Sequence, residues 1–123
     1  MSGRSKLGGA GLSGPKPLID QIERRVGRVE RLARVPSLAL RIARVAEGSI
    51  DVGLVSGNAR DWDFAGADLI LAEAGGVLSG FDGVEPAYNR PEPIHGELVA
   101  VSRGLHPAVI EAMTAGRDAA AQR

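Results

Sequence analysis

The sequence contains no cysteine, and this absence excludes several kinds of chemistry. Disulfide bonds, thiolate nucleophiles and cysteine-ligated zinc or iron–sulfur centres all need a thiol. We therefore expect a reducing, cytoplasmic environment. Aromatic residues are also scarce, with one Trp, one Tyr and two Phe among 123 residues. The core must be built from aliphatic side chains, which a hydrophobic fraction of 44% allows.

Long apolar runs and a net charge are missing as well. Outside glycine, no uninterrupted apolar run exceeds four residues, which is too short for a membrane span or a signal-peptide core. Fifteen Lys and Arg balance fifteen Asp and Glu, so no overall positive field attracts nucleic acid or anionic membrane. Seven arginines lie between positions 24 and 44, but acidic residues intersperse them, a pattern typical of a solvated helix face. We predict neither a nucleic-acid partner nor a membrane partner.

The chain divides by composition into three parts. Residues 1–14 contain five glycines and little to bury, which predicts a flexible leader or a truncated edge. Residues 15–116 carry the periodic apolar pattern of a folded portion, and residues 117–123 are expected to fray.

Within the folded portion, helical and extended patterns alternate. Helices are expected near 16–25, from the cap Ser37 to Gly48, from Trp62 to the Gly75-Gly76 pair, and across 106–115. Strands are expected in 49–57, in 76–84 before a turn at Asp82-Gly83, and in 97–102. This alternation predicts an α/β layer arrangement.

The stretch "DWDFAGADLILAEAGG", residues 61–76, carries the most specific signal. Its helix is apolar on neighbouring faces, which predicts a helix sandwiched between layers, with Gly66 permitting close approach. Asp63 falls in the first turn, where free N–H groups stabilise a carboxylate. Taken alone, these residues leave two functions open for Asp63: a helix cap, or an oxygen ligand for Mg²⁺.

This stretch resembles the C-terminal signature of the inositol monophosphatase family, which runs from Trp-Asp through an apolar segment to Glu-Ala-Gly-Gly. The flanking segments "SLALRIARVAEGSID" and "GELVAVS" resemble the family's neighbouring elements, so the resemblance extends from about Gly14 to Met113. It implies the C-terminal part of a layered αβαβα fold, with a mixed sheet flanked by helices. It also implies a Mg²⁺-dependent phosphomonoesterase of small phosphorylated metabolites such as inositol monophosphate, and a homodimer in the intact enzyme.

By the same resemblance, Asp63 is the second-metal ligand and Trp62 fixes the loop that presents it. The family's earlier motif, Asp-Pro-Ile/Leu-Asp-Gly-Thr, and an upstream Glu do not occur in this sequence, and Asp82-Gly83 is a turn. Because most ligands of a two-metal site would be missing, we expect the chain alone to lack phosphatase activity.

The substrate remains open at this point. Ser56 occupies the position at which animal-type inositol phosphatases carry a Glu, and Ser37 keeps the hydroxyl of the family's Gly-Ser/Thr-Ala motif; both are candidate substrate-binding residues. The stretch "YNRPEPIHG" resembles bacterial 3'(2'),5'-bisphosphate nucleotidases of the same family, and a non-catalytic, truncated interaction protein is a further alternative.

Two arginines and two histidines in and around these segments carry functional groups of their own. Arg60 and Arg90 are expected on the surface, although both are able to assist a doubly phosphorylated substrate. His95 is expected in a loop and His106 at a helix start, and neither has an oriented catalytic partner at useful spacing.

Overall fold

The computed structural model describes residues 1, 3–33, 35–57, 59–83, 85 and 94–121. The side chains of 59–64, 94–95 and 115–121 are outside this description.

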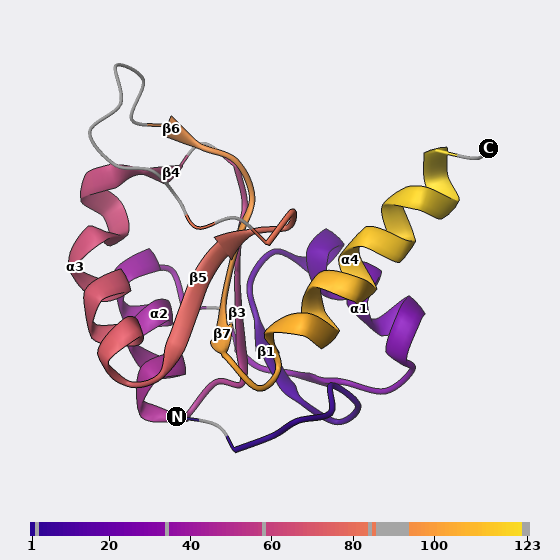
Figure 1. Cartoon of the computed structure of the whole chain (residues 1–123), viewed down its shortest axis with the longest axis horizontal. Helices are drawn as coiled ribbons and strands as arrows, with labels where there is room; N and C mark the ends of the chain where they lie inside the picture. Colours follow the sequence, from indigo (N-terminus) through magenta and orange to yellow (C-terminus); the bar gives the residue numbers. More distant parts are fainter. Residues whose placement is uncertain (2, 34, 58, 84, 86–93, 122–123) are drawn as a thin grey trace.

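The chain alternates between short strands and helices (Figure 1). In order, the elements are β1 (Gly11–Ser13), α1 (Lys16–Val26), β2 (Glu30–Arg31), α2 (Leu38–Glu47), β3 (Val52–Val55), β4 (Ala59–Arg60), α3 (Asp61–Glu73), β5 (Gly76–Gly80), β6 (Ile94–His95), β7 (Leu98–Ser102) and α4 (His106–Ala121). This order confirms the predicted α/β class and each of the helices expected from the sequence.

Five strands form one mixed sheet in the order β2-β1-β3-β7-β5. Strand β1 pairs in parallel with β2 and β3, whereas β7 pairs antiparallel with both β3 and β5. Strands β1, β3 and β5 therefore point the same way, and their carboxyl ends share one edge of the sheet. A separate pair, β4 and β6, is antiparallel.

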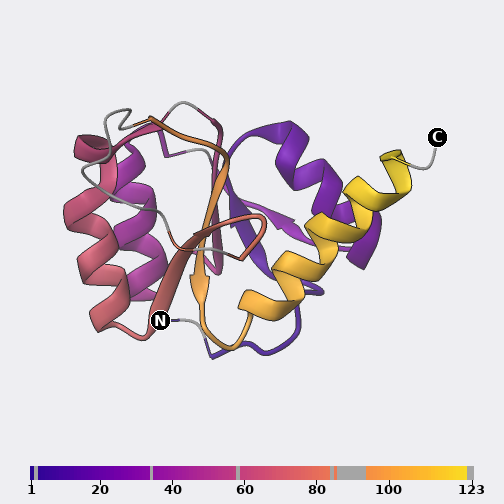
Figure 2. The same ribbon diagram turned by 45° about the horizontal axis from the view of Figure 1, so that its top comes forward.

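Helices cover both faces of the five-stranded sheet (Figures 1 and 2). Helices α2 and α3 pack side by side on one face, over a cluster that includes Ile42 and Leu71. Helices α1 and α4 lie on the other face, over a cluster that includes Ile22 and Met113. Strands β3 and β7 are buried along their whole length, as expected for strands covered on both sides.

Local chemistry explains where helix α2 begins and ends. Ser37 is its N-cap, and the Ser37 Oγ accepts the N–H of Leu40 at 3.2 Å. Gly48 ends the helix in the left-handed region, with a φ of 95°. Both boundaries were predicted from the sequence.

Of the two alternatives expected for residues 1–14, a flexible leader or a truncated edge, the flexible leader does not fit the second half of this segment. Leu7 and Ala10 are buried in the core, and Gly11–Ser13 forms the buried strand β1 between β2 and β3. Asp51 holds this segment in place, because its Oδ2 accepts the N–H of Gly11 at 2.7 Å. Glycine content misled the prediction, since these glycines belong to a strand and its turns.

One expectation about a helix face needs correction. The backbone of α4 continues to Ala121, and the fraying expected for residues 117–123 stays a prediction. Helix α3 is covered by the described protein on one side only: Leu71 is fully buried, but Leu69 and Ile70 are 63% and 53% exposed. A Cβ at Gly66 would meet no described atom within 4 Å outside its own helix backbone, so this glycine makes no tight contact here.

Among the described helices, none is long and apolar enough to cross a membrane.

Candidate functional site

Ser56 and Asp63 lie on the segment that follows the carboxyl end of β3, and Ser37 lies at the start of α2. Strand β1 leads into α1, and β3 leads through β4 into α3, so these helices begin where their strands end. Ser56 directly follows β3, and Ser37 caps α2. Carboxyl ends of parallel strands and N-termini of helices are where α/β proteins commonly bind anionic ligands.

Ser37 and Ser56 differ in what their side chains do. Ser37 is exposed, and its hydroxyl already accepts the Leu40 N–H as the cap of α2. Ser56 is exposed directly after the end of β3. The cap on Ser37 was predicted from the sequence, whereas a substrate contact by either serine remains a prediction.

Asp63 lies in the first turn of α3, as the sequence predicted. Helix α3 packs against α2, and both helices lie on the same face of the sheet (Figure 1). The side chains of Arg60, Trp62 and Asp63 are outside the described residues, as is Arg90. Metal ligation by Asp63 therefore stays a prediction.

The described residues do not by themselves make a magnesium site. Among them, no group of three or more His, Asp or Glu side chains lies close enough together to hold a metal ion. Mg²⁺ prefers several oxygen ligands and commonly keeps water and phosphate in its shell. If Asp63 holds a metal, further ligands must come from outside this described set.

Arg41 occupies a position that the sequence analysis misjudged. We expected the arginines of residues 24–44 on a solvated helix face. Arg31 is exposed and pairs with Asp20 and Glu23 at 2.6 and 3.0 Å, but it lies in strand β2 and not on a helix. Arg41 instead is 4% exposed. Its guanidinium donates to backbone carbonyls of Val35 and Leu54.

A serine–histidine contact was also missed. The Oγ of Ser79, on β5, lies 2.8 Å from Nε2 of His106, the first residue of α4. Ser79 has no exposed surface, so a substrate has no access to its hydroxyl. His106 does begin a helix, as predicted, while the backbone of His95 lies in β6 and not in a loop. Only the fold brings residues 79 and 106 together, because neither residue type nor spacing signals the contact.

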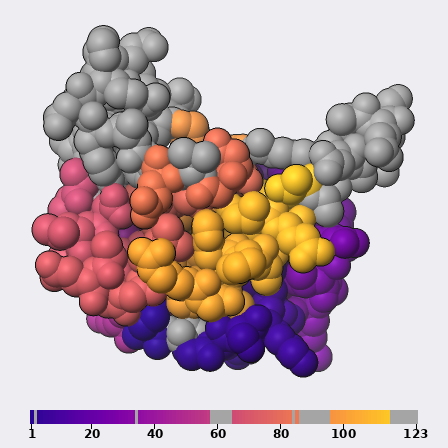
Figure 3. Space-filling model, in the orientation of Figure 1, coloured from indigo at the N-terminus to yellow at the C-terminus, as the bar shows by residue number. Residues whose placement is uncertain are grey.

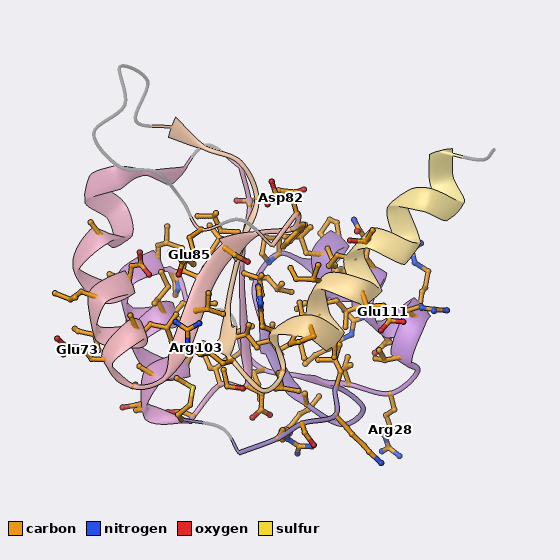
Figure 4. All side chains as sticks on the ribbon, in the orientation of Figure 1. Arg28, Glu73, Asp82, Glu85, Arg103 and Glu111 are labelled. Atoms are coloured by element: carbon orange, nitrogen blue, oxygen red, sulfur yellow. The ribbon has the colours of Figure 1, made fainter. Side chains whose placement is uncertain are left out.

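A cavity of about 370 Å³ lies away from this edge, between the segment Ser5–Gly8, α1 and α4. Leu7 and Ala112 contribute apolar surface, and Arg25 and Glu111 face each other across it at 3.8 Å. Figure 4 shows Glu111 on α4 on the side of α1. The cavity is on the face opposite α2 and α3, so it is separate from the predicted site.

The fold thus defines an α/β protein whose candidate site lies at the carboxyl edge of a mixed sheet, beside helix N-termini. The inositol monophosphatase family model matches residues 11–117, and the chain belongs to this family. Histidinol-phosphatase of Mycobacterium tuberculosis is 33% identical over 96 residues, and Nus factor SuhB of Escherichia coli is 39% identical over 82 residues. These alignments cover 76% and 67% of this chain, but only 34% and 27% of the two relatives.

Solved structures agree on the fold. Inositol monophosphatase II of Staphylococcus aureus matches with a TM-score of 0.77 at 21% identity, over 98% of this chain and 46% of that one. The IMPase of Thermotoga maritima matches with a TM-score of 0.73 at 21% identity, over 95% and 45%. The chain therefore spans less than half the length of these two proteins, and the mixed sheet with flanking helices is the family's.

Proposed function

We propose that this chain is the C-terminal portion of a Mg²⁺-dependent phosphomonoesterase that hydrolyses a small phosphorylated metabolite such as inositol monophosphate. The observation that carries the proposal is the family match over residues 11–117, which includes the segment from Trp62 to Gly76. Asp63 belongs to this segment and lies in the first turn of α3. The relative named histidinol-phosphatase supports a phosphatase role in general, without fixing the substrate.

In this proposal Asp63 supplies one carboxylate ligand to Mg²⁺, which would stabilise negative charge on the phosphoryl group when bound. The chain's own contribution is electrostatic and positional. Free N–H groups in the first turns of α2 and α3 favour a bound phosphate, and the hydroxyls of Ser37 and Ser56 are the candidate substrate contacts. We propose a cytoplasmic location, and the lack of cysteine in the sequence is compatible with it.

The proposal predicts that the chain alone does not turn over substrate, because one carboxylate cannot hold a two-metal site. The test is to assay phosphate release from inositol monophosphate, histidinol phosphate and a 3',5'-bisphosphate nucleotide with Mg²⁺. The chain is assayed alone and together with the part of Escherichia coli SuhB that precedes the matched region. We expect release only in the mixture.

The matched variants are Asp63→Asn and Asp68→Asn, both on α3. Asp63→Asn should abolish the restored activity, because an amide oxygen is a poorer ligand for a hard cation. Asp68→Asn should retain it. Sustained release by the chain alone would disprove the predicted inactivity, and restored activity that survives Asp63→Asn would remove Asp63 from the site. The substrate panel also separates the inositol-phosphatase function from the bisphosphate-nucleotidase alternative.

A second candidate function, a non-catalytic interaction module that includes homodimers, is favoured by one observation. In the described part of the chain, the large apolar side chains that stay exposed are Leu40 on α2 and Leu69 and Ile70 on α3. These two helices are neighbours, and α3 lies on the outer surface of the molecule (Figure 3). Exposed apolar surface on adjacent elements commonly marks an interaction site.

A further inference from the structure

One buried side chain connects two of the segments that carry the candidate site. The Nε and Nη2 atoms of Arg41 donate to the carbonyl oxygen of Val35 at 3.1 and 2.6 Å. Its Nη1 donates to the carbonyl oxygen of Leu54 at 2.8 Å. Val35 precedes the cap Ser37 by two residues, and Leu54 precedes Ser56 by two residues. A single guanidinium therefore fixes the approach to both serines.

Two glycines lie close to the contact between Arg41 and the Leu54 carbonyl. At Gly53 an added Cβ would lie tightly against Val45 Cγ2 at 3.1 Å and in ordinary contact with Arg41 Cγ at 3.6 Å, so the Arg41 stem packs directly against this strand. Gly14, at the end of β1, approaches the Leu54 carbonyl so closely that a Cβ would lie 2.6 Å from its oxygen. The ends of β1 and β3 and the helix α2 thus meet at the Leu54 carbonyl.

A second side chain, that of Ser13 on β1, also bonds to the segment that precedes α2. Ser13, which has no exposed surface, donates its hydroxyl to the carbonyl oxygen of Ala33 at 3.3 Å. The stretch before the cap of α2 is therefore tied to β1 through Ser13 and to β3 through Arg41. Two ties from neighbouring strands leave the Ser37 end of α2 little freedom to move relative to Ser56.

We propose that Arg41 is a positioning residue of the candidate site: it sets the N-terminus of α2 and Ser37 against the end of β3 and Ser56 so that both act on one bound phosphate. The inference rests on the proposed function. Arginine is required because its planar fork donates to two carbonyls in fixed directions, whereas the ammonium of Lys is a point donor on a flexible stem. Arg41 acts through the backbone and does not itself touch the ligand.

The test measures binding of inorganic phosphate to the full chain by isothermal titration calorimetry. The variants are Arg41→Lys, which keeps the charge but loses the fork, and Arg41→Met, which loses both. The control is Arg44→Met, an exposed arginine on the same helix. Circular dichroism and urea unfolding check that each variant is folded. In metal sites, changes to residues that orient the ligands commonly lower metal affinity or activity by about 10–100-fold, and we take the lower end of this range as a guide for phosphate.

We expect Arg41→Lys to weaken phosphate binding by about tenfold while remaining folded, and Arg44→Met to bind like the wild type. If Arg41→Met does not fold, Arg41→Lys decides. If Arg41→Lys binds phosphate as tightly as the wild type, the proposal is overturned, because a positive charge at residue 41 would then be enough without the planar fork of arginine.

A separate readout distinguishes failure of the proposal from failure of the proposed function. If the wild type does not bind phosphate, the phosphate site loses its support, and amide chemical shifts decide the role of Arg41. Shifts at Ser37 and Ser56 that move in Arg41→Lys but not in Arg44→Met support positioning. Equal shifts in both variants overturn it.

Discussion

The Nε2 of His106 lies 2.8 Å from Oγ of the buried Ser79 and so joins the start of α4 to strand β5. The Ser79 hydroxyl also donates to the Gly80 carbonyl at 2.9 Å. Because serine has one hydroxyl proton, both contacts are satisfied when Nε2 carries the ring proton and donates to Ser79. Burial, followed by the nearby charge of Arg103, lowers the pKa of His106 from its ordinary value of 6.5, and Glu85 opposes this shift.

This lowered pKa predicts how stability depends on pH. Below pH 6.5 the unfolded chain takes up a proton at His106 before the folded protein does. The contribution to stability is therefore complete above that pH and is lost as the pH falls through the folded pKa. Urea midpoints should fall across this window in the wild type and fall less in His106→Gln. The same pH dependence in both proteins would show that His106 does not control it.

Gly66→Ala should stabilise the isolated chain. Gly66 is exposed in helix α3, and a Cβ there meets no described atom within 4 Å outside its own helix backbone. Alanine is favoured over glycine in a helix interior by about 1 kcal/mol, so the free energy of unfolding should rise by roughly that amount in urea titrations.

The matched control for this change is Gly75→Ala. Gly75 has a φ of 91°, in the region that L-residues avoid, so alanine should destabilise by about 1–2 kcal/mol. Opposite signs for the two substitutions are expected. A loss of stability in Gly66→Ala would mean that another part of the protein packs against this position after all.

Much of the fold could be predicted because local signals agree with it. Ser37 and Gly48 bound α2 as cap residues should, and α3 ends before the Gly75-Gly76 pair, as predicted, with Gly75 at positive φ. These features depend on residues close together in the sequence. The family resemblance, which rests on a contiguous stretch, was confirmed for the same reason.

The features that could not be predicted depend on distant contacts. The sequence of residues 7–13 predicts a flexible segment because glycine lowers the propensity for helix and strand. Pairing of β1 with β2 and β3 nevertheless makes Gly11–Ser13 a buried strand. The sequence predicts Arg41 as a surface charge, because the carbonyl groups that accept its hydrogen bonds are brought to it only by the tertiary structure. Packing against the sheet decides which face of α3 is buried, and the uniform apolar character of that helix gave no way to choose.

Asp51→Ala should destabilise the protein through β1. The Asp51 Oδ2 accepts the Gly11 N–H at 2.7 Å and pairs with Arg4 Nε at 3.2 Å. Removing the acceptor leaves the Gly11 N–H without this partner at the start of a buried strand, which costs about 1–3 kcal/mol. Asp51→Asn, which keeps an acceptor oxygen, is the control and should lose less. If urea unfolding shows the same loss of stability in Asp51→Ala and Asp51→Asn, the effect comes from the ion pair with Arg4 and not from the hydrogen bond to Gly11.

The exposed apolar face of α2 and α3 predicts self-association. Burying Leu69 and Ile70 against a second surface removes apolar area from water, which favours association. Replacing both by Lys introduces like charges on that face, so the variant should be monomeric by light scattering at concentrations where the wild type associates. Two Lys placed elsewhere, at the exposed Ser5 and Thr114, add the same charge and should leave association unchanged. A wild type that stays monomeric at high concentration would argue against the interaction module, since the face would then be tolerated in water without a partner.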